Sequence, residues 1–232
     1  MEKHTAYYEL LKQLGQPDCP ICALAHRRTH AFLERYLDEG VVHEDTWDRL
    51  VAAGGWCGRH AHEIEGFDDG LAVALFYGHL LKLKQAELYN GRLMLPSQPG
   101  EADRTSLLGR FRRDQAQLQC PACSIEHETE HTQAHLVAMA LGEVEAVAAM
   151  EAHPGFCLGH VDLVLQRAAE AHRETFRVQQ GAKLKALADE LELFVRRSEH
   201  SSTGSEQAPF GAEKDAWKRA LKRYYGLSLG EA

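Results

Sequence analysis

The chain has 232 residues, of which 44% are hydrophobic, so it is long enough to bury a core as one body or as two units of roughly a hundred residues each. Its formal net charge is −8, which excludes the cationic field by which nucleic-acid-binding proteins attract phosphates, and we expect no such partner. No run approaches about eighteen uncharged apolar residues and no basic segment leads into an apolar one at the N-terminus, so we expect a cytoplasmic protein without a membrane span.

The first half of the sequence predicts helices and no strands. The expected helices cover residues 4–14, 22–38 and 44–53, a short stretch after Cys57, and residues 70–93. Gly15 and Pro17 end the first of these helices, and Gly54-Gly55 ends the third. No alternating run of Val, Ile and Thr flanked by hairpin turns occurs, so we predict an all-α fold.

The second half repeats this order of elements. Residues 95–104 are rich in helix breakers and predict a linker. The helices expected beyond it cover 105–118 and 122–141, a short stretch before Pro154, 157 to near 198 with a bend around Gly181, and 210–226. We therefore divide the chain into a first helical unit (1–94), the linker (95–104), a second helical unit (105–198) and a C-terminal segment (199–232) with Trp217, Leu221 and Tyr225 on one stripe.

All six cysteines belong to one pattern that occurs twice. Cys19-Pro-Ile-Cys22 is followed by Cys57-Gly-Arg-His60, and Cys120-Pro-Ala-Cys123 is followed by Cys157-Leu-Gly-His160. Cys120 follows Cys19 by 101 residues, and Cys157 follows Cys57 by 100. This spacing predicts two tandem homologous helical units, each carrying one copy of the pattern.

The pattern is typical of a metal site. A Cys-x-x-Cys turn supplies two thiolates, and a Cys-x-x-His at the start of a helix adds a third thiolate and an imidazole, which completes the closed tetrahedral shell of structural zinc. Disulfides would not require the matched histidines. The expected ligand groups are Cys19, Cys22, Cys57 and His60 in the first unit and Cys120, Cys123, Cys157 and His160 in the second, with two zinc ions per chain.

A pair of histidines one helical turn apart also occurs twice, as His26 and His30 and, 101 residues later, as His127 and His131. Each pair continues the helix face that begins with a cysteine. Three interpretations of these histidines stay open: they support the zinc ligands through hydrogen bonds, converge on an additional metal or haem site, or are simply exposed to solvent. No catalytic residues are predicted, because a Glu-x-x-His pair typical of di-iron helices occurs convincingly only once, at Glu128 and His131.

The Cys-Pro-x-Cys turns, the segment Gly55-Trp56-Cys57-x-x-His60 and the C-terminal stretch 209–220 resemble an uncharacterised bacterial family, a domain of unknown function with tandem CPxC and GFCxxH motifs. The resemblance covers nearly the whole chain, with Trp56 in place of the usual phenylalanine. It implies a cytosolic metal-binding protein and no particular reaction.

Two functions follow from these residues. The first is a zinc-stabilised module that binds another protein, in which metal binding is coupled to folding. The second is a redox or electron-transfer protein that carries iron–sulfur clusters at the Cys3His sites or haem at the paired histidines.

Overall fold

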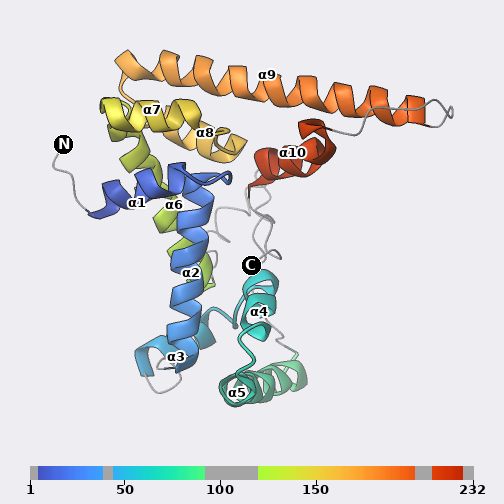
Figure 1. The fold of residues 1–232 in the computed structure, drawn as a ribbon. Coiled ribbons are helices and arrows are strands. Elements are labelled where there is room, and N and C mark those ends of the chain that lie inside the picture. The colour runs from blue at the N-terminus through green and yellow to red at the C-terminus, as the bar shows by residue number, and fades with distance from the viewer. Residues whose placement is uncertain (1–4, 39–43, 92–119, 202–210, 227–232) are drawn as a thin grey trace. The chain divides into compact units, whose positions relative to one another are not determined.

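The computed structural model describes residues 5–38, 44–91, 120–201 and 211–226 (Figure 1). These residues form ten α-helices and one short 3-10 helix and contain no strand, which confirms the predicted all-α class. The helices are α1 (Thr5–Leu14), α2 (Pro20–Asp38), α3 (Glu44–Ala52), α4 (Gly58–Glu65), α5 (Gly70–Tyr89), α6 (Pro121–Ala140), α7 (Val144–Ala152), α8 (Leu158–Leu165), α9 (Glu170–Ser201), η3 (Ala212–Asp215) and α10 (Ala216–Tyr225). The predicted linker 95–104 and helix 105–118 lie outside the described residues.

The chain folds into two compact units that do not follow the order of the sequence. Unit 1 contains residues 1–24 and 130–232, and unit 2 contains residues 25–129. The chain therefore passes from unit 1 into unit 2 within α2 and returns within α6. This division differs from the predicted one, in which the linker 95–104 separates two units that follow each other in the sequence. Among the described helices, none combines the length and apolar character that a membrane crossing requires.

The four helices that follow the cysteine motifs begin in two ways. In α2 and α6 a proline, Pro20 or Pro121, occupies the first helical position, where its missing N–H costs no hydrogen bond. Helices α4 and α8 begin after Cys57 and Cys157, which have extended backbones and form no side-chain cap. Each sulfur is thus placed at a helix N-terminus, where the helix dipole favours a thiolate.

The core of unit 1 gathers apolar side chains from six helices, with Ile21 as the contribution of α2. Its fully buried members include Tyr7 and Leu10 of α1, Val137 of α6, Met150 of α7, Val164 of α8 and Phe176 of α9. The Phe156 ring meets Phe176 edge-to-face, with 5.7 Å between ring centroids. Cys19 and Cys157 belong to this cluster, so the core supports the cysteines directly.

The core of unit 2 is richer in aromatic side chains. It is built from Leu33 and Tyr36 of α2, Leu50 of α3, Trp56, Ile64 of α4, Phe76 and Leu80 of α5, and Ala122 of α6. The Tyr36 and Trp56 rings meet edge-to-face at 4.9 Å, which anchors the turn before Cys57. Phe76 and Phe176 are both buried and stand 100 residues apart, although homology between the two halves stays a prediction.

The prediction of a single helix from 157 to near 198 is wrong. This range contains two helices, α8 and α9, and Gly181 lies within α9 without ending it. Arginines stabilise the break. Arg167 Nη1 donates to Leu163 O at 2.8 Å, and Arg173 donates to Leu165 O and Ala168 O, both at 3.0 Å. These donors satisfy carbonyls that the end of α8 would otherwise leave unpaired.

The C-terminal segment packs onto the rest of unit 1 through η3 and α10. Arg223 Nη1 donates to Phe156 O at 2.8 Å, and Lys222 lies 3.5 Å from the carboxylate of Asp18. The predicted apolar stripe faces away from these contacts, since Trp217, Leu221 and Tyr225 are 46%, 54% and 80% exposed. Helix α10 therefore packs through its basic side chains and presents its apolar stripe to solvent.

Candidate metal centres

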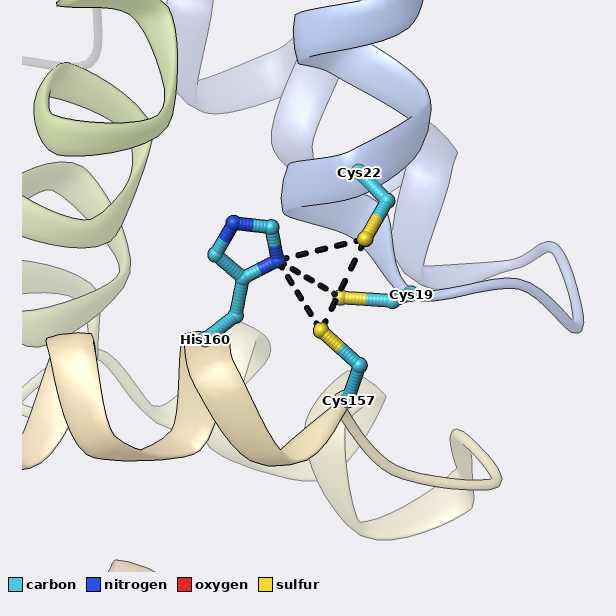
Figure 2. Close-up of side chains that lie close together, drawn as sticks. All are labelled: Cys19, Cys22, Cys157 and His160. Atoms are coloured by element: carbon cyan, nitrogen blue, oxygen red, sulfur yellow. Dashed lines mark hydrogen bonds between the residues drawn. The ribbon is translucent and has the colours of Figure 1, made fainter. Parts of the chain in front are cut away.

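The eight predicted ligands gather into two groups of four. The first consists of Cys19, Cys22, Cys157 and His160 (Figure 2), and the second consists of Cys57, His60, Cys120 and Cys123. In each group the four candidate ligand atoms lie within 4.8 Å of one another. The first group lies in unit 1 and the second in unit 2.

The partition of the ligands differs from the prediction, which placed Cys57 and His60 with Cys19 and Cys22 and was wrong. Each Cys-x-x-Cys meets the Cys-x-x-His of the other half of the sequence. The reason lies in the packing of Trp56, the residue before Cys57, whose ring lies 4.9 Å from the ring of Tyr36 between centroids. Tyr36 follows Cys22 by 14 residues, or about 21 Å along α2, so Cys57 is held beside the later part of that helix.

The first group has the dimensions of a tetrahedral site. His160 Nδ1 lies 3.5 Å from the sulfur of Cys19 and 3.2 Å from the sulfurs of Cys22 and Cys157. Figure 2 marks these three contacts with dashed lines. The Cys22 and Cys157 sulfurs are 3.6 Å apart. Ligand bonds of about 2.3 Å to sulfur and about 2.0 Å to nitrogen require separations of roughly 3.8 Å between sulfurs and 3.6 Å between sulfur and nitrogen. The observed distances agree to within a few tenths of an ångström.

The second group repeats this geometry. His60 Nδ1 lies 3.3, 3.5 and 3.4 Å from the sulfurs of Cys57, Cys120 and Cys123, and the Cys57 and Cys123 sulfurs are 3.6 Å apart. Both groups therefore offer three sulfurs and one Nδ1 to a common centre.

The electrostatics of the first group favour a cation at that centre. Hydrogen bonds with Cys19 and Cys22 lower the pKa of Cys157, whereas hydrogen bonds with Cys157 and Cys19 raise the pKa of Cys22. Burial opposes charging of His160, but the neighbouring Cys157 and Cys19 outweigh it and raise its pKa to about 12. Three sulfurs this close cannot all ionise without a compensating positive charge, which a divalent ion supplies.

The pKa values of the second group shift in the same directions as those of the first. Hydrogen bonds with Cys120 and Cys123 lower the pKa of Cys57, and hydrogen bonds with Cys120 and Cys57 raise the pKa of Cys123. Burial opposes charging of His60, yet Cys120 and Cys57 raise its pKa to about 9.

Carboxylates from α6 face the second nitrogen of each histidine. His160 Nε2 lies 3.2 Å from Glu130, and His60 Nε2 lies 3.9 Å from Glu126. Glu126 is also held by Arg59, whose Nη1 donates to Oε1 at 2.8 Å. Glu130 is within hydrogen-bonding distance of His160 Nε2 and fixes the tautomer in which Nε2 carries the proton and Nδ1 is free to bind metal. His60 Nε2 forms no hydrogen bond to the residues that the structure describes, so Glu126 acts on it only at longer range. Sequence reasoning missed both glutamates, because neither belongs to a motif.

The C-terminal end of α10 covers the first group. Gly226 is buried with φ 91°, and a Cβ there would lie 3.1 Å from the Cys22 sulfur and 3.8 Å from the Cys157 sulfur. Burial lowers the pKa of Arg223, and the Cys19 and Cys157 thiolates partly offset this by stabilising its charge. In the second group Arg59 provides the neighbouring positive charge: burial opposes it, but Glu126 and Cys123 raise its pKa.

Among the residues that the structure describes, the paired histidines do not belong to a third group of candidate ligand atoms within 4.8 Å of one another. Across the described ranges, the two Cys3His groups are the only sets of three or more candidate ligands at bonding separations. His30 packs on Phe67 with 4.6 Å between ring centroids, His26 Nε2 lies 3.8 Å from Glu63, and His131 contacts Arg167. Support of the zinc ligands by these histidines stays a prediction.

Comparisons with known proteins place the chain in a family. An uncharacterized 23.9 kDa protein from the xynA 3′ region of Caldicellulosiruptor sp. (strain Rt8B.4) is 25% identical over 194 residues, which cover 82% of this chain and 87% of that protein. No solved structure matches. Residues 14–229 match DUF6062, described as a family of unknown function, and this range contains all eight ligands of the two groups. The chain therefore belongs to the DUF6062 family.

Proposed function

We propose that the protein is a zinc-binding helical protein in which two structural Cys3His sites hold a surface that binds another protein. The observation that carries this proposal is the pair of closed donor groups, each with four ligand atoms within 4.8 Å of one another. Three thiolates and one imidazole suit zinc, and a shell filled by protein ligands leaves no position for a reacting water.

The positions of the donors support a structural role. In unit 1 an ion would join the start of α2 to the start of α8, and in unit 2 it would join the start of α4 to the start of α6. Because the donors of each group come from distant parts of the sequence, their shared ion ties together segments that the chain itself does not hold adjacent. Metal binding is then coupled to folding.

The proposed contact surface is the exposed stripe of α10. Trp217 and Leu221 are one turn apart, and Tyr225 follows one turn later. Aromatic residues of this kind dominate the energetics of protein–protein interfaces, whereas a monomer gains nothing from exposing them. A reducing compartment such as the cytoplasm suits a protein whose six cysteines all serve as metal ligands.

The alternative is a redox protein with iron–sulfur clusters or haem. Ligands of a cluster bind different iron atoms on its outer corners, so they lie further apart than donors around one ion. The 3.6 Å separations between sulfurs therefore favour a mononuclear site. The same donors would also hold a single iron ion, so the metal has to be measured.

Elemental analysis of protein purified without added metal tests the proposal. We expect about two zinc ions per chain and no absorption in the visible, because zinc is colourless. Replacement by Co²⁺ should give the absorption of a tetrahedral thiolate site. Iron in place of zinc, or visible bands in the purified protein, would support the redox alternative instead.

A further inference from the structure

We propose a third metal site in unit 2, separate from the Cys3His groups, in which His26 and His30 of α2 and Glu63 of α4 bind a divalent transition-metal ion. Its ligand set is two imidazoles and one carboxylate, with no thiolate. This combination is used by proteins for exchangeable or reactive metal ions and leaves further coordination positions open.

The carboxylate of Glu63 is the first observation. Its side chain is only 11% exposed, and both oxygens are buried without a hydrogen bond from any residue that the structure describes. An ionised carboxylate without a partner is costly to bury. The nearest charged partner is His26, whose Nε2 lies 3.8 Å from Oε1. A cation bound between these two atoms would satisfy both.

The geometry of α2 supplies the second imidazole. His26 and His30 are one turn apart, with 6.1 Å between their ring centroids, so both can reach one ion. Two ligand atoms about 2.1 Å from a tetrahedral ion lie roughly 3.4 Å apart, so the Glu63–His26 separation needs to close by a few tenths of an ångström. His30 packs on Phe67, so the site requires its ring to turn from Phe67 toward His26 and Glu63.

The second half of the sequence lacks this site, although it has a corresponding histidine pair in His127 and His131. The residue 100 positions after Glu63 is Leu163, which packs against the core of unit 1. The residue 100 positions after Phe67 is Arg167, whose guanidinium lies 2.5 Å from His131 Nδ1. A leucine offers no ligand and an arginine repels a cation, so we expect one such site per chain.

The exposure of His26 determines how readily an ion at this site exchanges with solvent. His26 is 29% exposed, which gives an ion access from solvent, whereas the ligands of the Cys3His groups are mostly buried. Imidazole and carboxylate suit Ni²⁺, Co²⁺ and Zn²⁺. We therefore expect a weaker and more readily exchanged ion here than at the Cys3His groups.

The test uses the untagged full-length protein with both Cys3His groups loaded with zinc. Titration with Ni²⁺, followed by calorimetry and elemental analysis, should show one additional ion per chain while both zinc ions remain. Glu63→Gln and His26→Asn should each weaken this binding by at least about 10-fold, since even a residue behind a metal ligand commonly contributes that much. His30→Ala should weaken it too. His127→Ala and His62→Ala are the matched controls and should bind as the parent does.

A thermal measurement separates a metal ligand from a merely structural carboxylate. Without added Ni²⁺, Glu63→Gln should melt at the same temperature as the parent or higher, because it removes a buried carboxyl group that accepts no hydrogen bond. With Ni²⁺ the parent should gain stability and the variant should not. Absence of a third ion in the parent, equal binding by Glu63→Gln, or equal binding by His30→Ala overturns the three-ligand site. Failure of the proposed zinc-binding function has a separate readout, because the purified protein would then contain no zinc.

Discussion

His153 shows how one buried side chain makes the stability of unit 1 depend on pH. Its Nε2 donates to Asp18 O at 3.0 Å, and its Nδ1 accepts from Gly155 N at 2.9 Å, so the neutral ring satisfies both partners. Burial lowers the pKa of His153. Protonation of Nδ1 would abolish the bond from Gly155, which is why the folded protein resists it.

We predict that His153→Gln reduces the loss of stability on acidification. Because the folded pKa of His153 lies below the unfolded value of about 6.5, the unfolded chain takes up more protons, and this contribution is present above that pH and lost below it. Urea unfolding of metal-loaded protein at pH 7.5 and 5.5 should show a smaller decrease in the free energy of unfolding for the variant, by no more than about 1.4 kcal/mol for each pH unit below 6.5. His62→Gln, at a position 86% exposed, is the control. Equal decreases in His153→Gln and the parent would contradict the prediction.

The glutamates of α6 should set how tightly each Cys3His group retains its ion. Glu130→Gln should lower the metal affinity of the first group about 10- to 100-fold, because His160 loses the carboxylate that orients it. Glu126→Gln should have a smaller effect, since its carboxylate is further from His60 and is shared with Arg59. Competition with a chelator measures both affinities, and Glu128→Gln on the same helix is the control. A larger effect of Glu126→Gln would contradict this ranking.

At the residue scale, the sequence predicts the ligands but not their neighbours. The eight ligands were recognisable because residue type and local spacing alone define Cys-x-x-Cys and Cys-x-x-His. Glu63, Glu126 and Glu130 were not, because their importance depends on which helix faces them across the fold. No local pattern carries that information.

At the scale of elements, α10 distinguishes the two metal groups. Gly226, which caps its C-terminus, lies against Cys22 and Cys157 of the first group, and the half-buried Arg223 lies near Cys19 and Cys157. Sequence periodicity predicted the helix and its apolar stripe, but assigned no role to its basic face. That face holds α10 against unit 1, through contacts to Phe156 and Asp18 that are far away in the sequence.

We predict that Gly226→Val speeds the loss of metal from the first group only. A β-branched residue is strained at φ 91°, and its Cβ would lie 3.1 Å from the Cys22 sulfur, so the end of α10 must move away. Extraction of zinc by excess chelator should then become several-fold faster for one of the two ions. Gly91→Val is the matched control, because Gly91 also has a positive φ, but a Cβ at that position would meet no atom within 4 Å. Unchanged extraction in Gly226→Val would show that α10 does not limit metal release.

At the scale of the whole molecule, the crosswise pairing of motifs can be tested by counting ions. Cys22→Ser with Cys157→Ser removes two ligands from one group and should leave about one zinc ion per chain, whereas Cys22→Ser with Cys57→Ser damages both groups and should leave about none. Both variants lose two cysteines, so each is the control for the other. The opposite result would restore the arrangement in which each half of the sequence builds its own site.

The sequence alone could not decide between these arrangements. Either Cys-x-x-His completes the shell of either Cys-x-x-Cys, so ligand chemistry is the same in both. The choice depends on the packing of Trp56 against Tyr36, which holds Cys57 beside the later part of α2. The all-α class needed less information, because it follows from the periodicity of each segment by itself.

The crosswise pairing also has a consequence for biosynthesis. A nascent chain that has emerged from the ribosome as far as residue 119 contains one full copy of the motif pattern but neither complete donor group. Translation at about 5–20 residues per second leaves Cys19 and Cys22 waiting on the order of 10 s for Cys157. If the two groups bind zinc as proposed, the early thiols are open during that interval to oxidation or to the wrong metal, and correct loading would require a reducing environment until translation is nearly complete.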